Sequence, residues 1–325
     1  MKKRAILPLT AVMMMLILDS QCAVRSAQDA LTLCLKTLVP TLFPLFVFSA
    51  MLVPPLASCR IPRVVRFLGL PEWGEGLFLL GCVGGYPVGA ACVSQAVRSG
   101  SLKREDAQRI LGLVTLCGPA FLFGVIGSVL SMGQALLLFF IQLEAVMLTS
   151  HFFTAPSQTI CQPTSMPPVS IHEAMDKAIS TTLTVCGWVM LAGVMSGFLK
   201  RWFAPLLPGR SSVLLTGLLE LTSGVFALEQ VQEEGLRFIL CAVMVCFGGI
   251  SVHLQTAAFA GNAGLSMGQC IRQKAIQGIL GAVIAAGVHS FGPAFLLLGL
   301  ILAAVKIAVE ISGGMVYNGP RKEGI

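Results

Sequence analysis

The stretch CVGGYPVGAA (82–91) interrupts a long apolar run, GLFLLGCVGGYPVGAACVSQAV (76–97). Glycine and proline disfavour the interior of a helix, yet they stand at the centre of a segment apolar enough to enter a membrane. Glycine permits a tight turn, and proline suits the first turn of a helix that follows. The stretch therefore predicts a helical hairpin that turns between Gly84 and Pro87.

The composition predicts a membrane protein. Of the 325 residues, 55% are hydrophobic and 11% are charged, whereas soluble proteins are about 25% charged. Several apolar stretches approach the ~20 residues that a helix needs to cross ~30 Å of hydrocarbon. Backbone groups in lipid must be paired within the segment, and the chain lacks the alternating pattern of a barrel. We therefore expect an all-α polytopic membrane protein.

The hydropathy pattern also predicts the order of the segments. Simple spans are expected at 5–22, 30–56, 110–130, 133–151, 175–199, 270–289 and 292–313, and less simple segments at 61–76, 77–97 and 211–258. The expected organisation is an N-terminal transmembrane helix (1–29), a first repeat (30–151), a polar proline-rich loop (152–173), a second repeat (174–290), and a C-terminal helix with its tail (291–325). The N-terminal segment also has the basic start and apolar core of a signal peptide, so cleavage is the alternative to an uncleaved helix.

Basic residues flank the opening segment on both sides. Arg60, Arg63 and Arg66 precede it, and Arg98, Lys103, Arg104 and Arg109 follow it. The positive-inside rule places both clusters in the cytoplasm, and 77–97 is too short to cross the membrane twice. We therefore expect a re-entrant hairpin. Non-helical backbone at membrane depth is tolerated only inside protein or beside a wet cavity, so the hairpin predicts a cavity.

The second half of the chain contains a similar segment, CFGGISVHLQ (246–255). Upstream, GLLELTSG (217–224) resembles GLPEWGEG (69–76) in the first half. Two matched elements in the same order predict an internal repeat with a second hairpin at Gly248 and Gly249. If the loop at 152–173 is cytoplasmic, the repeats are inverted; if 211–231 spans the membrane, the second hairpin moves to the cytoplasmic side. Interrupted segments at corresponding places in two halves point to a transporter binding site.

Five segments carry a resemblance to a known family. In order they are LVPTLFPLFVFSAMLV (38–53), GGYPVGA (84–90), GPAFLFG (118–124), GLLELTSG (217–224) and GGISVHLQ (248–255). Together they resemble the sporulation integral membrane protein YlbJ/SpoVV family, which belongs with the nucleoside-recognition Gate domain proteins and is distantly similar to concentrative nucleoside transporters. Where that family usually carries Ser-Asn before a proline, this chain has Cys117 and Gly118 before Pro119.

The resemblance implies a function and a location. Members of the family are associated with moving dipicolinic acid across the outer forespore membrane during sporulation. The expected protein is therefore an integral bacterial membrane transporter of a small anionic metabolite. A nucleoside-type transporter and a non-transporting membrane scaffold for spore-envelope assembly are the alternatives.

The two turns supply the candidate binding residues. Helices that begin at a turn direct N–H groups and a positive dipole end inward, which favours an anion. The substrate-binding candidates are Gly84, Gly85, Tyr86, Ser94, Gln95, Cys117, Gly118, Gly248, Gly249, Ser251, His253 and Gln255. Tyr86 could stack on an aromatic acid or anchor a packed helix, and His253 could line the pocket or bond a neighbouring backbone group. The break at Cys117 and Gly118 could turn carbonyls toward the cavity or be a packing kink.

Glu220 is a candidate for coupling because an ionisable group in an apolar segment is costly and usually functional. Thr222 and Ser223 could support it, and Pro87 and Pro119 are candidates for gating. If 211–231 is an interfacial helix, Glu220 is instead solvated. Glu144 raises the same question, whereas Lys306 and Glu310 should neutralise each other at i, i+4.

Other classes of function find no support in the sequence. No catalytic motif, metal signature or phosphate loop occurs, so we expect no enzyme and no cofactor. The 11 cysteines lie scattered in apolar runs and are expected to be packing residues. The net charge of +7 is expected from cytoplasmic loops and not from nucleic-acid binding. The expected partners are the small anionic substrate and the lipid bilayer, with a homo-oligomer possible.

Overall fold

The computed structural model describes residues 6–57, 74–153, 168–203, 209–297, 299 and 301, and these ranges are helical apart from short connections. Six helical stretches in them are long and apolar enough to cross a membrane: Ser20–Pro55, Arg104–Val129, Met132–Ser150, Ile171–Trp202, Glu234–Asn262 and Met267–Phe291. The chain is therefore an all-α polytopic membrane protein, as the composition predicts.

The helices of the first half are α1 (Ile6–Leu18), α2 (Ser20–Leu33), the π-helical turn Cys34–Leu38, α3 (Val39–Ala57), α4 (Gly74–Gly84), α5 (Val88–Arg98), α6 (Arg104–Val114), α7 (Pro119–Phe121), the π-helical turn Leu122–Ile126, α8 (Gly127–Val129) and α9 (Met132–Phe153). Those of the second half are α10 (Ile171–Phe203), α11 (Gly209–Leu219), α12 (Leu221–Ala227), the 3-10 turn Leu228–Gln230, α13 (Glu234–Phe247), α14 (Gly249–Asn262) and α15 (Met267–Phe291).

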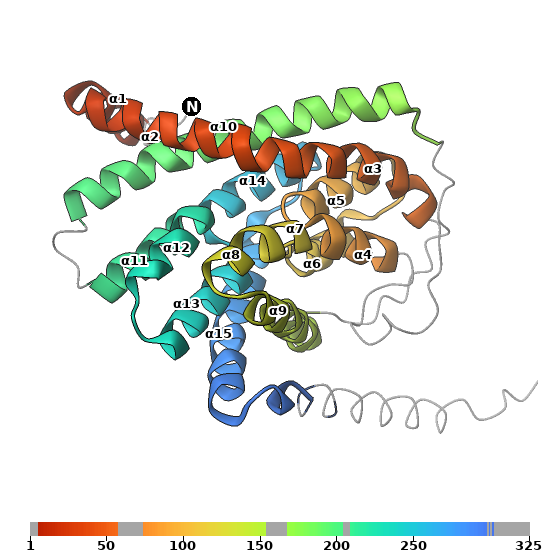
Figure 1. The fold of residues 1–325 in the computed structure, drawn as a ribbon. Coiled ribbons are helices and arrows are strands. Elements are labelled where there is room, and N and C mark those ends of the chain that lie inside the picture. Colours follow the sequence, from red (N-terminus) through yellow and green to blue (C-terminus); the bar gives the residue numbers. More distant parts are fainter. Residues whose placement is uncertain are drawn as a thin grey trace, which may run out of the picture.

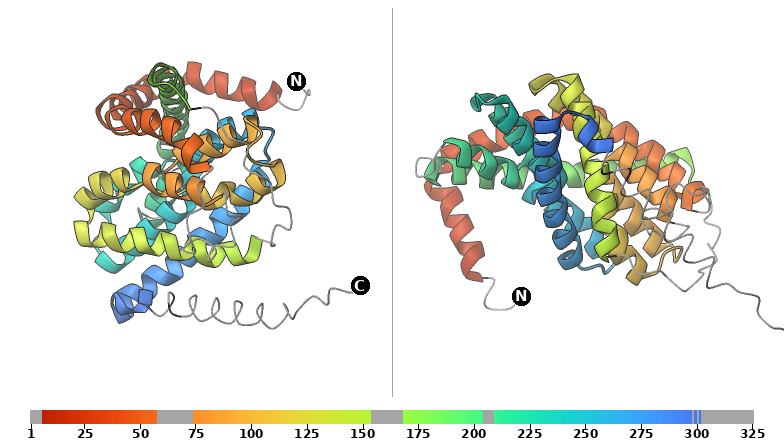
Figure 2. Two further views of the ribbon diagram at one scale, coloured as in Figure 1. Left: turned by 90° about the vertical axis from the view of Figure 1, so that its right-hand side faces the viewer. Right: turned by 90° about the horizontal axis from the view of Figure 1, so that it is seen from below.

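The predicted N-terminal span, 5–22, differs from the structure. α1 has 13 residues and a length of about 20 Å, short of the ~30 Å of hydrocarbon. It ends because Asp19 leaves the helical conformation, with φ −124° and ψ 53°. α1 projects away from the rest of the bundle (Figure 2). The segments 61–76 and 292–313, with Arg60, Arg63, Arg66, Lys306 and Glu310, lie wholly or mostly outside the described residues.

Two apolar cores hold together the bundle of helices drawn in Figure 1. One gathers side chains of α3 to α6, α10 and the end of α14, and the other gathers side chains of the π-helical turn Leu122–Ile126, α9, α11 to α13 and α15. The chain passes from the first core to the second between Leu116 and Cys117, in the break between α6 and α7. This break therefore lies where the two halves of the molecule meet.

α4 and α5 pack side by side, as the glycine-rich stretch predicts. The crossing depends on Gly81 and Gly89, whose added Cβ atoms would lie 2.2 and 2.1 Å from the carbonyl oxygen of Val114. Any larger side chain would push α6 away, because small residues are what allow helices to approach this closely. The predicted turn at residues 84–87 joins the two helices.

In the second half, the side-by-side pair is α11 and α12, which turn at Glu220. A Cβ on Gly224 would lie 2.1 Å from the Cα of Gly217, so this crossing also requires glycine. At Gly248, where we expected the second hairpin, α13 and α14 instead diverge: α13 packs on α15, and α14 packs on α5 and α10. Consecutive left-handed residues, Gly248 (φ +93°) and Gly249 (φ +72°), redirect the chain there without folding it back on itself.

Candidate functional site

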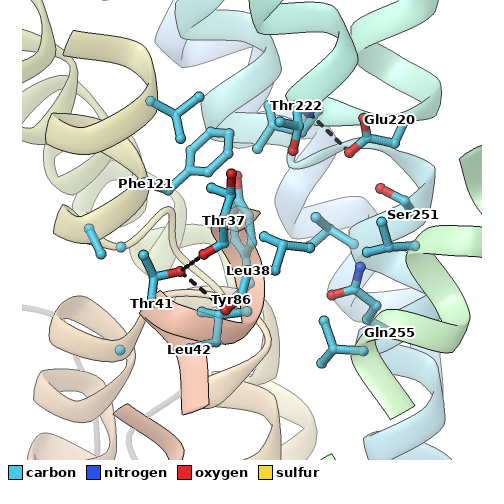
Figure 3. A pocket seen from close by; sticks show the side chains of 18 residues that line it. Thr37, Leu38, Thr41, Leu42, Tyr86, Phe121, Glu220, Thr222, Ser251 and Gln255 are labelled. Carbon is cyan, nitrogen blue, oxygen red and sulfur yellow. Dashed lines mark hydrogen bonds between the residues drawn. The ribbon is translucent and has the colours of Figure 1, made fainter. Parts of the chain in front are cut away.

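One cavity lies between the turn of α4 and α5, the break before α7, the turn at Glu220 and the first turns of α14 (Figure 3). It contains about 690 Å³ of empty space, including the part open to solvent. The predicted site residues that line it are Gly84, Tyr86, Gly118, Glu220, Thr222, Ser251 and Gln255. Residues far apart in the sequence thus meet at the place where four helices begin.

Other predicted residues shape the walls without lining the cavity. Gly85 and Gly249 are packing positions: a Cβ on Gly85 would lie 2.5 Å from the Gly118 nitrogen, and one on Gly249 would lie 3.0 Å from the Gly217 oxygen. Gly248 ends α13, Pro87 precedes α5, and Pro119 is the first residue of α7. Gly85 and Gly249 therefore bring backbones together, whereas Gly84 and Gly118 lie in the cavity lining.

Tyr86 lies at the turn between α4 and α5 and lines the cavity. Its ring lines the cavity, whereas its hydroxyl oxygen is fully buried beside the thiol of Cys117. Its backbone N–H donates to the carbonyl oxygen of Leu116 at 2.6 Å, which ties the turn to the break. The residue is therefore anchored through its backbone, and its side chain extends along the cavity wall.

The break at residues 115–118 is held by two side chains that the sequence analysis missed. Gln142 of α9 accepts from the Cys117 N–H at 3.0 Å and donates to the Cys117 carbonyl at 2.8 Å. Lys274 of α15 donates to the Thr115 carbonyl at 2.9 Å. These carbonyls, like that of Leu116, are bound by protein groups, so the expectation that freed carbonyls face the cavity is wrong, and the alternative of a packed kink describes the break.

Glu220 is 4% exposed, which excludes the alternative of a solvated interfacial residue. Its carboxylate caps α12, accepting from the N–H groups of Thr222 at 3.0 Å and Ser223 at 2.6 Å. Capping by a carboxylate explains why a new helix begins here, since it satisfies N–H groups that have no partner inside the helix. Glu220 is also the one charged side chain among the 18 residues that line the cavity.

His253 lies outside the cavity, against both expectations for it. It is 8% exposed, its ring meets the ring of Phe247 edge-on at 4.7 Å, and neither ring nitrogen has a hydrogen-bond partner among the described residues. Its neighbours on the same helix, Ser251 and Gln255, do line the cavity. The helical period therefore separates three residues that the sequence analysis grouped together.

Ser94 and Gln95 lie in a second, polar cleft between α5, the first half of α10 and the end of α14. This cleft shares no lining residue with the central cavity. A third cleft, beside α2 and the second half of α10, shares Thr37, Val189, Glu220 and Thr222 with the cavity. The central cavity therefore continues toward the third cleft and is separate from the second.

Some wall residues carry no strong signal in the sequence. Thr37, Thr41 and Phe121 line the cavity but resemble ordinary residues of apolar helices. Lys274 had a signal, because an ionisable residue within an apolar span is unusual. Glu144 has that signal too, and it is buried with one carboxylate oxygen unpartnered, away from the cavity. Within the described ranges, no group of three or more His, Cys, Asp or Glu residues is placed to hold a metal ion.

Comparisons with models of protein families, with curated proteins and with solved structures found no match to this chain.

Proposed function

We propose that this chain is a membrane transporter of a small anionic metabolite, with dipicolinate as the first candidate substrate and the outer forespore membrane as the location. The observation that carries the proposal is the convergence of interrupted helices from both halves on one interior cavity. Interrupted helices around a midplane site are the usual construction of secondary transporters. The substrate and the location come from the resemblance to the YlbJ/SpoVV family.

We also propose that the chain contains an inverted internal repeat, in a register different from that of the sequence match. A helix pair, an interrupted helix and a long helix follow one another in each half: α4–α5, α6–α8 and α9, then α11–α12, α13–α14 and α15. The two pairs lie at opposite ends of the bundle in Figure 1, and both turns reach the cavity. In this register the turn at residues 84–87 corresponds to Glu220, and the break at residues 115–118 corresponds to Gly248. We propose that both pairs are re-entrant hairpins.

The walls suit a flat anion in two respects. α14 begins at the cavity without a side-chain cap, and Ser251 and Val252 of its first turn line the wall, so the N–H groups there and the dipole end are available to a carboxylate. The rings of Tyr86 and Phe121 line the same cavity and can pack against an aromatic ring. A small aromatic acid would use both features.

A nucleoside-type substrate is the second candidate, and Glu220 is the observation that favours it. A carboxylate in the wall accepts hydrogen bonds from hydroxyl groups, as the sugar of a nucleoside would require. Gln255 can donate to or accept from a base edge across the same cavity. Binding of a nucleoside would depend less on the helix ends that favour an anion and more on the carboxylate of Glu220.

Uptake by proteoliposomes tests the proposal. The purified protein is reconstituted, and uptake of dipicolinate and of uridine is measured against liposomes without protein. Saturable uptake of dipicolinate supports the first candidate, and saturable uptake of uridine alone supports the second. Uptake of neither solute overturns the transporter proposal and favours the membrane scaffold.

Replacing Glu220 by glutamine should have opposite effects on the transport of the two solutes. Removing a negative charge from the wall should lower the KM for dipicolinate by about 3- to 10-fold, because like charges repel across a low-dielectric site. Uridine uptake should instead fall by about tenfold if Glu220 accepts from a sugar hydroxyl. Glu229→Gln, on the exposed turn after α12, is the matched control. Unchanged kinetics for both solutes would show that Glu220 does not act on the substrate.

The sidedness of the two helix pairs can be measured with single cysteines in a background without native cysteines. Gln95 lines the second cleft and Ser223 lines the third, so Gln95→Cys and Ser223→Cys report the accessibility of the two clefts. If the pairs are inverted, a membrane-impermeant thiol reagent should label these two positions from opposite faces, each at least about tenfold faster than from the other face because ionic reagents cross hydrocarbon poorly. Labelling of both from one face would contradict the inverted arrangement.

A further inference from the structure

Lys274 is a buried cation that the described residues do not pair with a carboxylate. It lies on α15, is 1% exposed, and donates from Nζ to the carbonyl oxygen of Thr115 at 2.9 Å and to Oε1 of Gln277 at 2.8 Å. Both acceptors are neutral. In the part of the chain that the structure describes, no carboxylate forms an ion pair with it.

The hydrogen bond to Thr115 does not by itself require a charge. On the same helix, the amides of Gln273 and Gln277 donate to the carbonyls of Arg109 at 2.7 Å and Gly112 at 3.1 Å. These two glutamines bind the end of α6 with neutral groups, as Gln142 binds the break. Burying an ammonium costs far more free energy than burying an amide. We therefore expect the charge of Lys274 to serve a function that an amide could not serve.

The ammonium binds the segment of backbone that leads into the cavity wall. Thr115, whose carbonyl it binds, is three residues before Gly118, which lines the cavity. Three extended residues span at most about 11 Å, so Nζ is within about 14 Å of the Gly118 backbone. The titratable groups around it are the thiols of Cys117, Cys246 and Cys270 and the ring of His253, none of which is an acid of carboxylate strength.

We propose that Lys274 is the charge that selects anions: its ammonium, placed behind the break at residues 115–118, balances the negative charge of the bound substrate. The inference rests on the proposed function and adds a specificity residue to it. It answers a feature of the cavity itself, whose one charged lining residue, Glu220, would repel an anion. At 14 Å and an effective dielectric of 20, one cation favours each negative charge on the ligand by roughly sevenfold.

Binding of two matched ligands tests this role. Dipicolinate and its neutral diamide have the same ring and size but differ by two negative charges, so the ratio of their Kd values for purified protein reports charge selection. Lys274→Met should change that ratio in favour of the diamide by about 50-fold, roughly sevenfold for each of the two charges, while Lys274→Arg should keep it. Lys274→Gln, which retains an amide donor toward Thr115, should behave as Lys274→Met does and serves if that variant fails to assemble.

Gln273→Met is the matched control for loss of a hydrogen bond. Gln273 is as buried as Lys274 and also binds a carbonyl of α6, but it carries no charge. This variant should weaken both ligands alike and leave their ratio within about twofold, because no charge is lost. If Lys274→Met and Lys274→Gln also leave the ratio unchanged, Lys274 is only a backbone cap and the inference is overturned. If the wild-type protein binds neither ligand, the proposed function fails instead.

Discussion

Replacing Gly85 by alanine should reduce uptake by at least about a hundredfold and destabilise the protein by about 3–5 kcal/mol. Gly85 has φ +70°, a conformation that costs an L-residue about 1–2 kcal/mol. The new Cβ would also lie 2.5 Å from the nitrogen and 2.7 Å from the Cα of Gly118. Because both neighbours are backbone atoms, the turn and the break would have to separate, and the cavity wall would open between them.

Substitutions at two other glycines separate the conformational cost of Gly85→Ala from the cost of its steric clash. Gly100 has φ +76° with no atom within 4 Å of an added Cβ, so Gly100→Ala should show the conformational cost alone, about 1–2 kcal/mol. Gly133 on α9 has neither strain nor a close neighbour, so Gly133→Ala should leave stability unchanged or raise it by up to ~1 kcal/mol. Thermal unfolding in detergent and uptake by proteoliposomes measure all three. A Gly85→Ala protein that melts and transports like Gly133→Ala would contradict the packed turn.

Replacing Gln142 by leucine should destabilise the protein by about 2–6 kcal/mol and remove most uptake. Gln142 is 2% exposed and is bound to both the N–H and the carbonyl of Cys117. Leucine would leave both backbone groups buried without these partners, and each orphaned group costs about 1–3 kcal/mol. The break at residues 115–118 would then lose its connection to α9, and with it the position of Gly118 in the cavity wall.

The matched control is Gln134→Leu on the same helix. Gln134 bonds Glu234 on an exposed surface at 3.2 Å, where water can replace the lost partner. Its replacement should change stability by less than about 0.5 kcal/mol. Equal unfolding temperatures for the two variants would show that the bonds to Cys117 do not hold the break.

The membrane class and five of the spans are predictable because they depend on local properties. Length and hydropathy over about 20 residues decide whether a helix can cross hydrocarbon, and these can be read from any window of the chain. The turn at Gly84 and Gly85 is predictable for the same reason, since the conformational freedom of glycine is a property of the residue itself.

The position of the second helix pair is not predictable in this way. Gly248 and Gly249 repeat the letters of the first turn, but their neighbours α13 and α14 find their partners elsewhere, on α15 and α5. The pair forms at Glu220 because its carboxylate begins a new helix and because Gly217 meets Gly224. In the sequence alone, neither Glu220 nor the pair of Gly217 and Gly224 indicates a turn more strongly than Gly248 and Gly249 do.

The sequence by itself determined the medium in which this protein lies and the points where its helices can bend, because burial in lipid and backbone freedom are set residue by residue. Only the tertiary structure decided which bends pack side by side, which carbonyls Gln142 and Lys274 bind, and which seven of the predicted site residues share one cavity. These outcomes depend on contacts between residues far apart in the chain, such as Lys274 and Thr115, which are separated by 159 positions. Such contacts follow from the packing of whole helices and not from any single window of the sequence.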